Sequence, residues 1–390
     1  MATIKSLILN IKRKSSIVNY TPEPSSRLVL INRIFDKLEN FKNFSNEKIT
    51  NFLKETEASV TNYDLNFDYD YFTVDQILKS ILPDELSNEI PSSFETIGHI
   101  AHLNLRDQYK PFKFIIGQVI LDKMKNIRTV VNKLDNIDHT FRFFKMELLA
   151  GDNIMNAEVK ESGCTFKLDF SKVYWNSRLQ MEHDRLILKN FKRNDVICDV
   201  MAGIGPFSIP SAKNVGALVF ANDLNPNSFE SLNENIKLNK VAHKVKCFNL
   251  DGRIFIKESI LELNKEELIG ELRENFVPTK TARVKDTDAF RGLLTPYKHR
   301  LPKKFKLPII HCYCFSTEVD NLEADVIERC SKALGYKLTK ADILNFHRVR
   351  DVAPRKEMVC ISFTCPEPVL FLNNNEADNT FDHEAKKIKI

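Results

Sequence analysis

The sequence predicts an α/β fold built on a doubly wound parallel sheet, and residues 195–253 carry this prediction. Short apolar segments alternate there with longer segments of helical character, which is the chain order of a βαβαβ unit. Polar residues follow the apolar segments, where the parallel strands of such a unit end. Ligands bind at the carboxyl ends of strands in open parallel sheets, so we expect a binding site at this edge.

The first strand of the unit is expected between Val196 and Val200, because β-branched residues dominate this run and suit a sheet covered on both faces. Asp199 lies near its end. Gly203 and Gly205 follow in a turn, where the missing Cβ permits unusual backbone angles and lets a ligand approach the main chain. By itself this turn is weak evidence, because ordinary tight turns contain similar glycines.

The next two strands end in acidic residues that suit a nucleoside. Asp223 ends the second strand about twenty residues further on, where an acid can accept hydrogen bonds from both ribose hydroxyls. Asp251 ends the third strand and can accept the exocyclic amine of adenine. With their neighbours, these positions predict a cofactor site made of Asp199, Gly203, Gly205, Asp223, Leu224, Asp251 and Gly252.

The residues after the glycine turn favour S-adenosylmethionine over a dinucleotide. A dinucleotide site needs a third Gly or Ala at the first helical turn, so that the helix can approach the pyrophosphate. Ser208 occupies that position here, preceded by the bulky Pro206 and Phe207. A sulfonium needs no such cradle, so an NAD-dependent oxidoreductase remains the less favoured alternative.

Composition excludes several other classes of protein. The 390 residues are 43% hydrophobic and 28% charged, which is typical of globular proteins and enough for two or three domains. No apolar run reaches the roughly 18 residues that a membrane span requires. The 8 cysteines form no CxxC pair, which favours reduced thiols over a disulfide framework or a zinc site. We therefore expect no membrane association and no metal.

Changes in pattern along the chain predict four parts. Residues 1–24 form a basic tail with no acid before Glu23, and either a mitochondrial transit peptide or a frayed tail has this composition. Residues 25–93 carry helical periodicity and form an accessory domain, residues 94–170 form a small α+β domain, and residues 171–390 form the α/β domain. The last of these ends in two strands, within VRDVAPRKEMVCISFTCP.

The α+β domain is predicted in more detail. We expect a strand from Ile97 to Leu103, a helix around Ile115–Ile120, and a strand at Thr129–Val131. A hairpin should follow, because Met155–Val159 and Thr165–Leu168 alternate on either side of a Glu-Ser-Gly turn.

Several segments together resemble a known family. They read SFETIGHIAHLNLR, FRFFKMELLAG, KVYWNSRLQMEHDR, the run from 195 to 253, and VRDVAPRKEMVCISF. In this order, over residues 94–366, they resemble the eukaryotic and archaeal tRNA (guanine-37-N1)-methyltransferases. The resemblance implies a class I, Rossmann-like S-adenosylmethionine-dependent domain, preceded by an RNA-binding-like domain and an N-terminal domain that recognises tRNA shape. It also implies a monomer acting on cytoplasmic and mitochondrial tRNAs, and leaves the nucleus open.

The chemistry of such a reaction needs two protein groups. N1 of guanine carries a proton near neutral pH, so a general base must remove it, and a positive group must stabilise the charge that grows on O6. The resemblance assigns these roles to Glu182 and Arg142, and makes His183 a contact to the cofactor. From the residues alone, Glu182 could instead form an exposed helix pair with Arg185, and Arg142 could lie along neighbouring phenylalanines.

Other residues have simpler interpretations. We expect Trp175 to be a packed anchor, and Asn225-Pro226 to be a turn that begins a helix. A base in a stacked anticodon loop must turn out to reach the pocket, and phosphate contacts from basic residues would offset the cost. Candidates for these contacts are Lys145, Arg178, Arg348, Arg350 and Arg355.

One segment departs from the family pattern. The family carries Asn-Leu-Pro on the fourth strand, whereas the corresponding region here reads RENFVPTKTARVKDTDAFRGLLTPYKHR and lacks the motif. We expect the fourth strand to be deleted, or replaced by a basic segment that cannot fill a buried strand site, which leaves a gap beside the pocket. This departure keeps a second hypothesis open, namely a catalytically impaired RNA-binding relative.

Overall fold

The computed structural model describes residues 17–19, 27–29, 64–65, 67–86, 89–137, 141, 144–263, 278–300 and 306–371. It divides into two compact units, Met1–Ile90 and Pro91–Ile390. No helix in these described ranges has the length and apolar character needed to cross a bilayer.

In the described residues of the first unit there is an antiparallel pair of strands, β1 (Ile17–Asn19) and β2 (Arg27–Val29), and the α-helix α4 (Val74–Ile81). Thr73 begins α4 because its side chain accepts a hydrogen bond from the backbone of Gln76, and the Gln76 side chain accepts one from Thr73 in return. Much of the segment 25–93, for which helical periodicity was predicted, lies outside the described residues.

The second unit begins with a four-stranded sheet in the order β3-β4-β5-β6. The helix α5 (Lys113–Lys123) packs on it and confirms the predicted helix. The single strand predicted from Ile97 to Leu103 is wrong, because Gly98 has a φ of +55° and turns the chain into a hairpin. The strands are β3 (Glu95–Ile97), β4 (Ile100–Leu103), β5 (Thr129–Ile137) and β6 (Phe144–Gly151).

The predicted hairpin after this sheet is confirmed as β7 (Asn156–Glu161) and β8 (Cys164–Asp169). Two asparagines hold it in place: Asn235 of the helix α8 (Pro226–Leu238) and Asn239, which caps the end of this helix. The Asn235 amide accepts from the backbone N–H of Lys167 at 2.7 Å and donates to its carbonyl at 3.0 Å. Asn239 bonds the backbone of the same strand in the same way, so the hairpin is fixed on α8.

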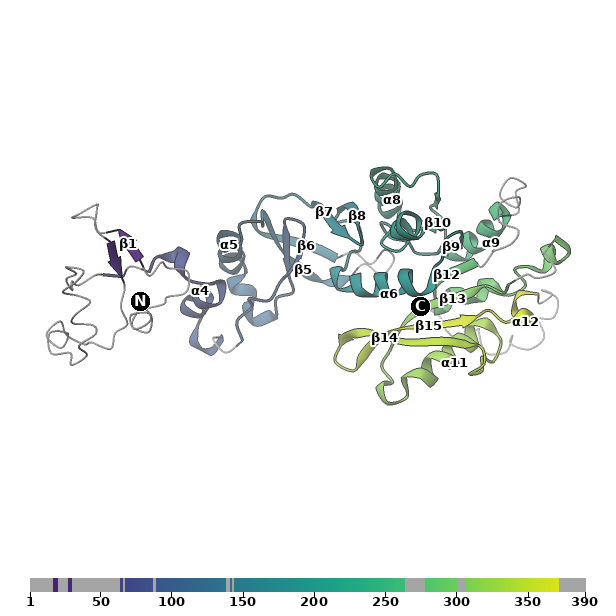
Figure 1. Ribbon diagram of the computed structural model, residues 1–390. Helices are drawn as coiled ribbons and strands as arrows, with labels where there is room; N and C mark the ends of the chain where they lie inside the picture. Colours follow the sequence, from purple (N-terminus) through teal and green to yellow (C-terminus); the bar gives the residue numbers. More distant parts are fainter. Residues whose placement is uncertain are drawn as a thin grey trace, which may run out of the picture. The chain divides into compact units, whose positions relative to one another are not determined.

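The α/β domain contains a seven-stranded sheet in the order β11-β10-β9-β12-β13-β15-β14 (Figure 1). Strands β9 to β13 are parallel and β15 is antiparallel to both of its neighbours, which confirms the predicted α/β fold. The strands are β9 (Val196–Asp199), β10 (Leu218–Asn222), β11 (Val245–Phe248), β12 (Pro278–Arg283), β13 (Ile309–Ser316), β14 (Ile343–Ala353) and β15 (Lys356–Thr364).

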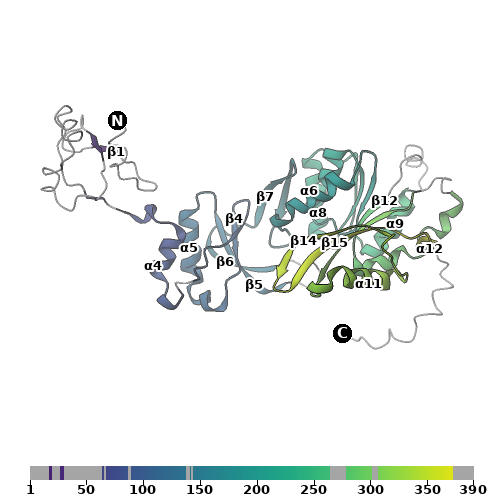
Figure 2. The ribbon, with the colours of Figure 1, turned by 60° about the horizontal axis from the view of Figure 1, so that its bottom comes forward.

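Helices cover both faces of this sheet. Figure 2 shows α6 (Gln180–Asn190) and α8 on one side and α11 (Leu322–Leu334) on the other. A hydrophobic core lies on each face of the sheet, and alternate side chains of β9 belong to one core or the other. Ile197 packs with α6 and α8, whereas Val196 and Cys198 pack with α11 and α9 (Gly252–Leu263). Burial on both faces explains the uninterrupted apolar character of the strand.

The expected gap in the sheet is a wrong prediction, because β12 lies between β9 and β13 and pairs in parallel with both. The basic segment therefore fills the place of the fourth strand, with Pro278 opposite Val196 and Thr281 opposite Asp199. A strand forms through backbone hydrogen bonds that any sequence can make, and a proline is tolerated as the first residue. The Asn-Leu-Pro motif itself is still absent from the sequence.

The outer strand β14 is irregular. Its pairing with β15 shifts register between Ile343 and Asn345, between Arg348 and Arg350, and between Asp351 and Ala353. Each shift marks a bulge, which bends the strand and increases its twist.

Candidate active site

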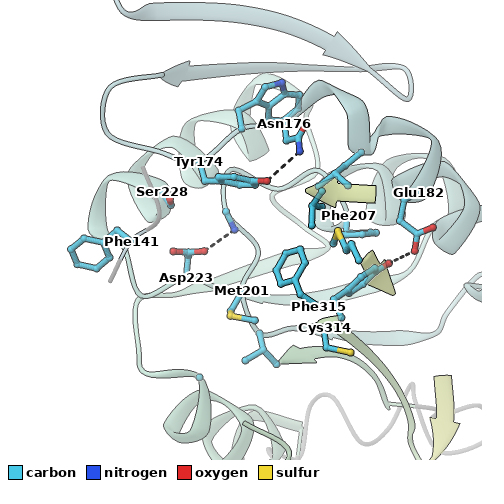
Figure 3. Close-up of a pocket in the computed structure, with 18 of the residues that line it drawn as sticks. Phe141, Tyr174, Asn176, Glu182, Met201, Phe207, Asp223, Ser228, Cys314 and Phe315 are labelled. Atoms are coloured by element: carbon cyan, nitrogen blue, oxygen red, sulfur yellow. Dashed lines mark hydrogen bonds between the residues drawn. The ribbon is translucent and has the colours of Figure 1, made fainter. Parts of the chain in front are cut away.

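A cavity of about 1210 Å³ opens at the carboxyl edge of the seven-stranded sheet (Figure 3). Most of the residues predicted for the site line it, namely Glu182, His183, Asp199, Gly203, Asp223, Leu224, Asp251 and Gly252. Gly205 is not part of the lining, and Arg142 lies outside the described residues.

The turn after β9 is fixed to the end of β10. The Asp223 carboxylate accepts from the backbone N–H of Gly203 at 2.8 Å and from that of Asn225 at 2.9 Å. Gly203 has a φ of +57°, and a Cβ added there would meet no atom within 4 Å. The space beside Gly203 is therefore open, and a ligand can approach its backbone there.

At position 205, packing and not ligand access requires a glycine. Its φ is +102°, and a Cβ would come within 2.8 Å of side-chain carbons of Ile209 and Leu232. The close packing of this turn against α8 therefore requires the missing side chain. Gly205 supports the shape of the turn without lining the cavity.

Asn222 also lines the cavity and was missed in the sequence. Its amide donates to the carbonyls of Val200 and Leu250 at 3.0 Å each and accepts from the Leu250 N–H at 2.9 Å. One side chain thus joins the ends of β9 and β10 to the segment after β11. A buried asparagine at the end of an apolar strand was the available signal.

Glu182 is buried at the wall of the cavity, with only 5% of its surface exposed. Arg185 binds both of its oxygens, with Nε–Oε2 at 2.5 Å and Nη2–Oε1 at 2.7 Å. The alternative of an exposed helix pair is therefore wrong. Because of the hydrogen bond with Glu182, the pKa of Arg185 is raised above its ordinary value.

Residues from β13 and β14 complete the surroundings of Glu182. The Tyr313 hydroxyl donates to Glu182 Oε1 at 2.7 Å, which is the dashed line at Glu182 in Figure 3. His347 Nε2 lies 3.4 Å from Oε2. Burial raises the pKa of Tyr313 well above its ordinary value, so the hydroxyl keeps its proton and remains a donor. Tyr313 was not predicted, since 131 residues separate it from Glu182.

His183 follows Glu182 on α6 and is also buried. Its Nδ1 makes a short contact with the buried Glu161 carboxylate at the end of β7, and its ring lies edge-on to Phe207 with 4.6 Å between centroids. Glu161 therefore orients the imidazole, and a position on the helix surface is excluded. Glu161 belongs to the Glu-Ser-Gly turn predicted from the sequence, and nothing in the sequence indicates this further role.

Aromatic side chains form another wall. Tyr174 lies across the upper part of the cavity in Figure 3, and its hydroxyl accepts from the Asn176 amide at 3.3 Å. Trp175 is 7% exposed and packs against Phe166, which confirms its role as an anchor. Asn225 caps α8 and Pro226 is its first residue, so the predicted helix-entry turn is also confirmed.

The basic residues predicted to contact phosphates lie in different environments. Arg178 pairs with Glu95 at 2.5 Å, and Arg348 lies 3.5 Å from Glu357. Arg350 lines the cavity. Lys145 and Arg355 are exposed and are not part of the lining.

Comparisons with known proteins agree with this geometry. Residues 157–289 match the family described as "TRM5/TYW2 methyltransferase domain", and residues 74–154 match "TYW2 N-terminal domain". The tRNA (guanine(37)-N(1))-methyltransferase of Batrachochytrium dendrobatidis is 46% identical over 407 residues, which cover 95% of this chain and 84% of the relative.

Solved structures are similar as well. Wild-type Trm5b from Pyrococcus abyssi is 29% identical with a TM-score of 0.54, over 73% of this chain and 78% of that one. TYW2 from Pyrococcus horikoshii, solved in complex with MeSAdo, is 25% identical with a TM-score of 0.54, over 75% and 97% of the two chains.

Proposed function

This chain belongs to the tRNA (guanine(37)-N(1))-methyltransferase family, and we propose that it transfers a methyl group from S-adenosylmethionine to N1 of guanosine 37 in tRNA. The observation that best supports this cavity as the active site is its lining. The buried carboxylate of Glu182 lines the same cavity as Gly203 of the glycine turn and as Asp199, Asp223 and Asp251. A base and a nucleoside site are thus side by side.

The residues present fit S-adenosylmethionine. The open space beside Gly203 admits a ligand against the backbone, and the Asp223 carboxylate is held at the place where ribose hydroxyls bind in this fold. Asp251 is fixed by the Arg253 N–H at 2.9 Å and suits the adenine amine. When bound, the sulfonium supplies an electrophilic methyl group. The Ser208 hydroxyl donates to Asp199 at 2.7 Å, so it fills the place where a pyrophosphate would need room.

The chain's own residues supply the proton chemistry. Glu182 accepts the proton from N1 of guanine. Its two hydrogen bonds with Arg185 hold the carboxylate in the wall of the cavity. Tyr313 holds the same carboxylate from β13 and restricts its rotation. For the charge on O6 we propose Arg142, on the family resemblance. We propose His183, held by Glu161, as a contact to the methionine part of the cofactor.

We propose cytoplasmic and mitochondrial tRNAs as substrates and a monomer as the active form. The basic residues 1–22, which include no acid, support delivery to the mitochondrial matrix.

A catalytically impaired RNA-binding relative is the second candidate, because the sequence lacks Asn-Leu-Pro. A gap in the sheet no longer supports this candidate, because β12 pairs with both β9 and β13 and the sheet is continuous beside the cavity. The missing asparagine side chain remains as its support.

Methyl transfer to an unmodified tRNA transcript tests the proposal. We expect tritium from labelled S-adenosylmethionine in tRNA with guanosine 37 and none when that position is adenosine. Calorimetry should show binding of S-adenosylhomocysteine and none of NAD. If the protein binds cofactor and tRNA but transfers no methyl group, the hypothesis of an RNA-binding relative is favoured over that of an enzyme. If it binds NAD and not S-adenosylhomocysteine, both hypotheses are wrong.

A further inference from the structure

Charged residues are unevenly distributed around the cavity, and apart from Lys133 on β5 its Lys and Arg residues come from α11, β14 and β15. At one end lie three carboxylates: Asp199 is the last residue of β9, Asp223 follows β10, and Asp251 lies beyond the end of β11. Beyond β13, the lining includes Arg329 and Lys332 of α11, Arg350 of β14 and Lys356 of β15. The acidic residues in the described lining are Glu95, Glu182, Asp199, Asp223 and Asp251. Of these, Glu182 borders the second end, because it contacts Tyr313 of β13 and lies 3.4 Å from His347 of β14.

Three of these four cations form no ion pair with a described residue, so their charge can attract a ligand. Arg329 is neutralised, because it bonds Asp325 at 3.1 Å and the carbonyl of Phe315 at 2.8 Å. In the part of the chain that the structure describes, no ion pair involves Lys332, Arg350 or Lys356. We call these three residues the cationic cluster.

The contacts that the cluster does make leave its charges unopposed. Arg350 Nε donates to the Asp351 carbonyl at 3.2 Å, and Lys356 Nζ lies 5.5 Å from the centroid of the Phe315 ring. A carbonyl and an aromatic ring orient a cation without cancelling its charge. Several unpaired cations at one end of a cavity attract an anion.

We propose that the cationic cluster binds a backbone phosphate of the RNA next to the target guanosine, an inference that rests on the proposed function. A nucleotide that turns out of a loop brings its phosphates with it, whereas its base is uncharged. If the base reaches Glu182 and the adenosyl group lies over Asp223, the remaining end faces the RNA backbone. The carboxylate of the cofactor is the other anion that could bind there, and the test separates the two.

The first experiment measures the affinity of a fluorescently labelled anticodon stem-loop RNA against salt concentration. Lys332→Ala, Arg350→Ala and Lys356→Ala should each raise Kd about 3- to 10-fold, and each should reduce the slope of log K against log salt by about 0.7 to 1. The matched control is Lys189→Ala/Lys337→Ala/Lys340→Ala, which removes three exposed cations that do not line the cavity. A triple variant of the cluster whose slope equals that of the control would overturn the inference.

A second measurement identifies the anion. S-adenosylhomocysteine should bind the triple cluster variant within about 2-fold of wild type, which also shows that the variant is folded. A large loss of this affinity with RNA binding unchanged would assign the cluster to the cofactor carboxylate and overturn the proposal.

Methylphosphonate substitution then locates the phosphate. Neutralising the matching phosphate should weaken wild-type binding about 3- to 10-fold and leave the triple variant unchanged. If every position weakens both proteins equally, the cluster contacts no specific phosphate and the inference fails. Because all these measurements are of binding, they stay informative if methyl transfer is absent, so failure of the proposed function and failure of this inference can be told apart.

Discussion

At the scale of single residues, partners distant in sequence hold the proposed catalytic groups. Glu182 depends on Tyr313, which lies 131 residues away, and His183 depends on Glu161 across 22 residues. The family resemblance was sufficient to propose Glu182 and His183. It could not identify Glu161, Tyr313 or Asn222, because their roles arise from contacts that form only when β7, β13 and the strand ends come together.

The first prediction concerns the base. Glu182→Gln keeps the shape of the side chain but removes its basicity, so methyl transfer should fall at least about 100-fold while the Kd for S-adenosylhomocysteine changes less than about 2-fold. Single-turnover transfer and calorimetry measure the two effects. Glu158→Gln, an exposed substitution on β7, should leave both unchanged. Wild-type transfer by Glu182→Gln would exclude the base role.

The second prediction separates the two glycines of the turn. Gly203→Ala places a methyl group in open space, so it should weaken S-adenosylhomocysteine binding about 10-fold or more and cost only about 1 kcal/mol of stability for its positive φ. Gly205→Ala meets Ile209 and Leu232, so it should lower the free energy of unfolding by about 2 kcal/mol or more. Calorimetry and urea unfolding check this; equal effects of the two variants on binding and stability would contradict it.

At the scale of elements, local pattern was enough where an element's own residues determine it. The hairpin β7–β8 was found from its alternation and turn, and β9 from its buried apolar run. The strand β12 was missed because its place comes from the backbone groups of β9 and β13, and the composition PTKTAR does not show them. The turn at Gly98 was missed because apolar residues continue on both sides of it.

The third prediction tests β12 directly. Thr281→Pro removes a backbone N–H from the interior of a strand with neighbours on both sides, so it should destabilise the domain by roughly 2 kcal/mol or more. Thr281→Val keeps the N–H and should cost less than about 1 kcal/mol. Urea unfolding measures the difference. If Thr281→Pro and Thr281→Val have the same free energy of unfolding, the segment does not pair as a central strand in solution.

At the scale of the whole molecule, buried histidines make stability depend on pH. Burial lowers the pKa of His311 and of His102 to about 3 each, so both are neutral in the folded protein. The unfolded chain takes up their protons below about pH 6.5. The contribution of the two neutral histidines to the free energy of unfolding is therefore fully present above pH 6.5 and is lost as the pH falls from there toward 3. The loss is up to about 1.4 kcal/mol per pH unit for each histidine.

The fourth prediction is the corresponding measurement. The fluorescence of Trp175, the only tryptophan, reports unfolding of the Pro91–Ile390 unit in urea between pH 7.5 and 5. His311→Gln should reduce the slope of unfolding free energy against pH by about 1 kcal/mol per unit, while the exposed His243→Gln should not change it. A slope in His311→Gln equal to that of wild type would show that His311 does not titrate as its burial implies.

The bulges of β14 have a consequence for how copies of this protein meet. A straight, regular outer strand offers its unpaired main-chain groups as a template on which another molecule can add a strand, the first step toward aggregation. Here three breaks in register bend that border, and it carries two arginines, Arg348 and Arg350. Charged side chains on an outer strand oppose the addition of another strand. We therefore expect concentrated solutions to resist edge-to-edge association, even though Leu344 on this strand is 53% exposed.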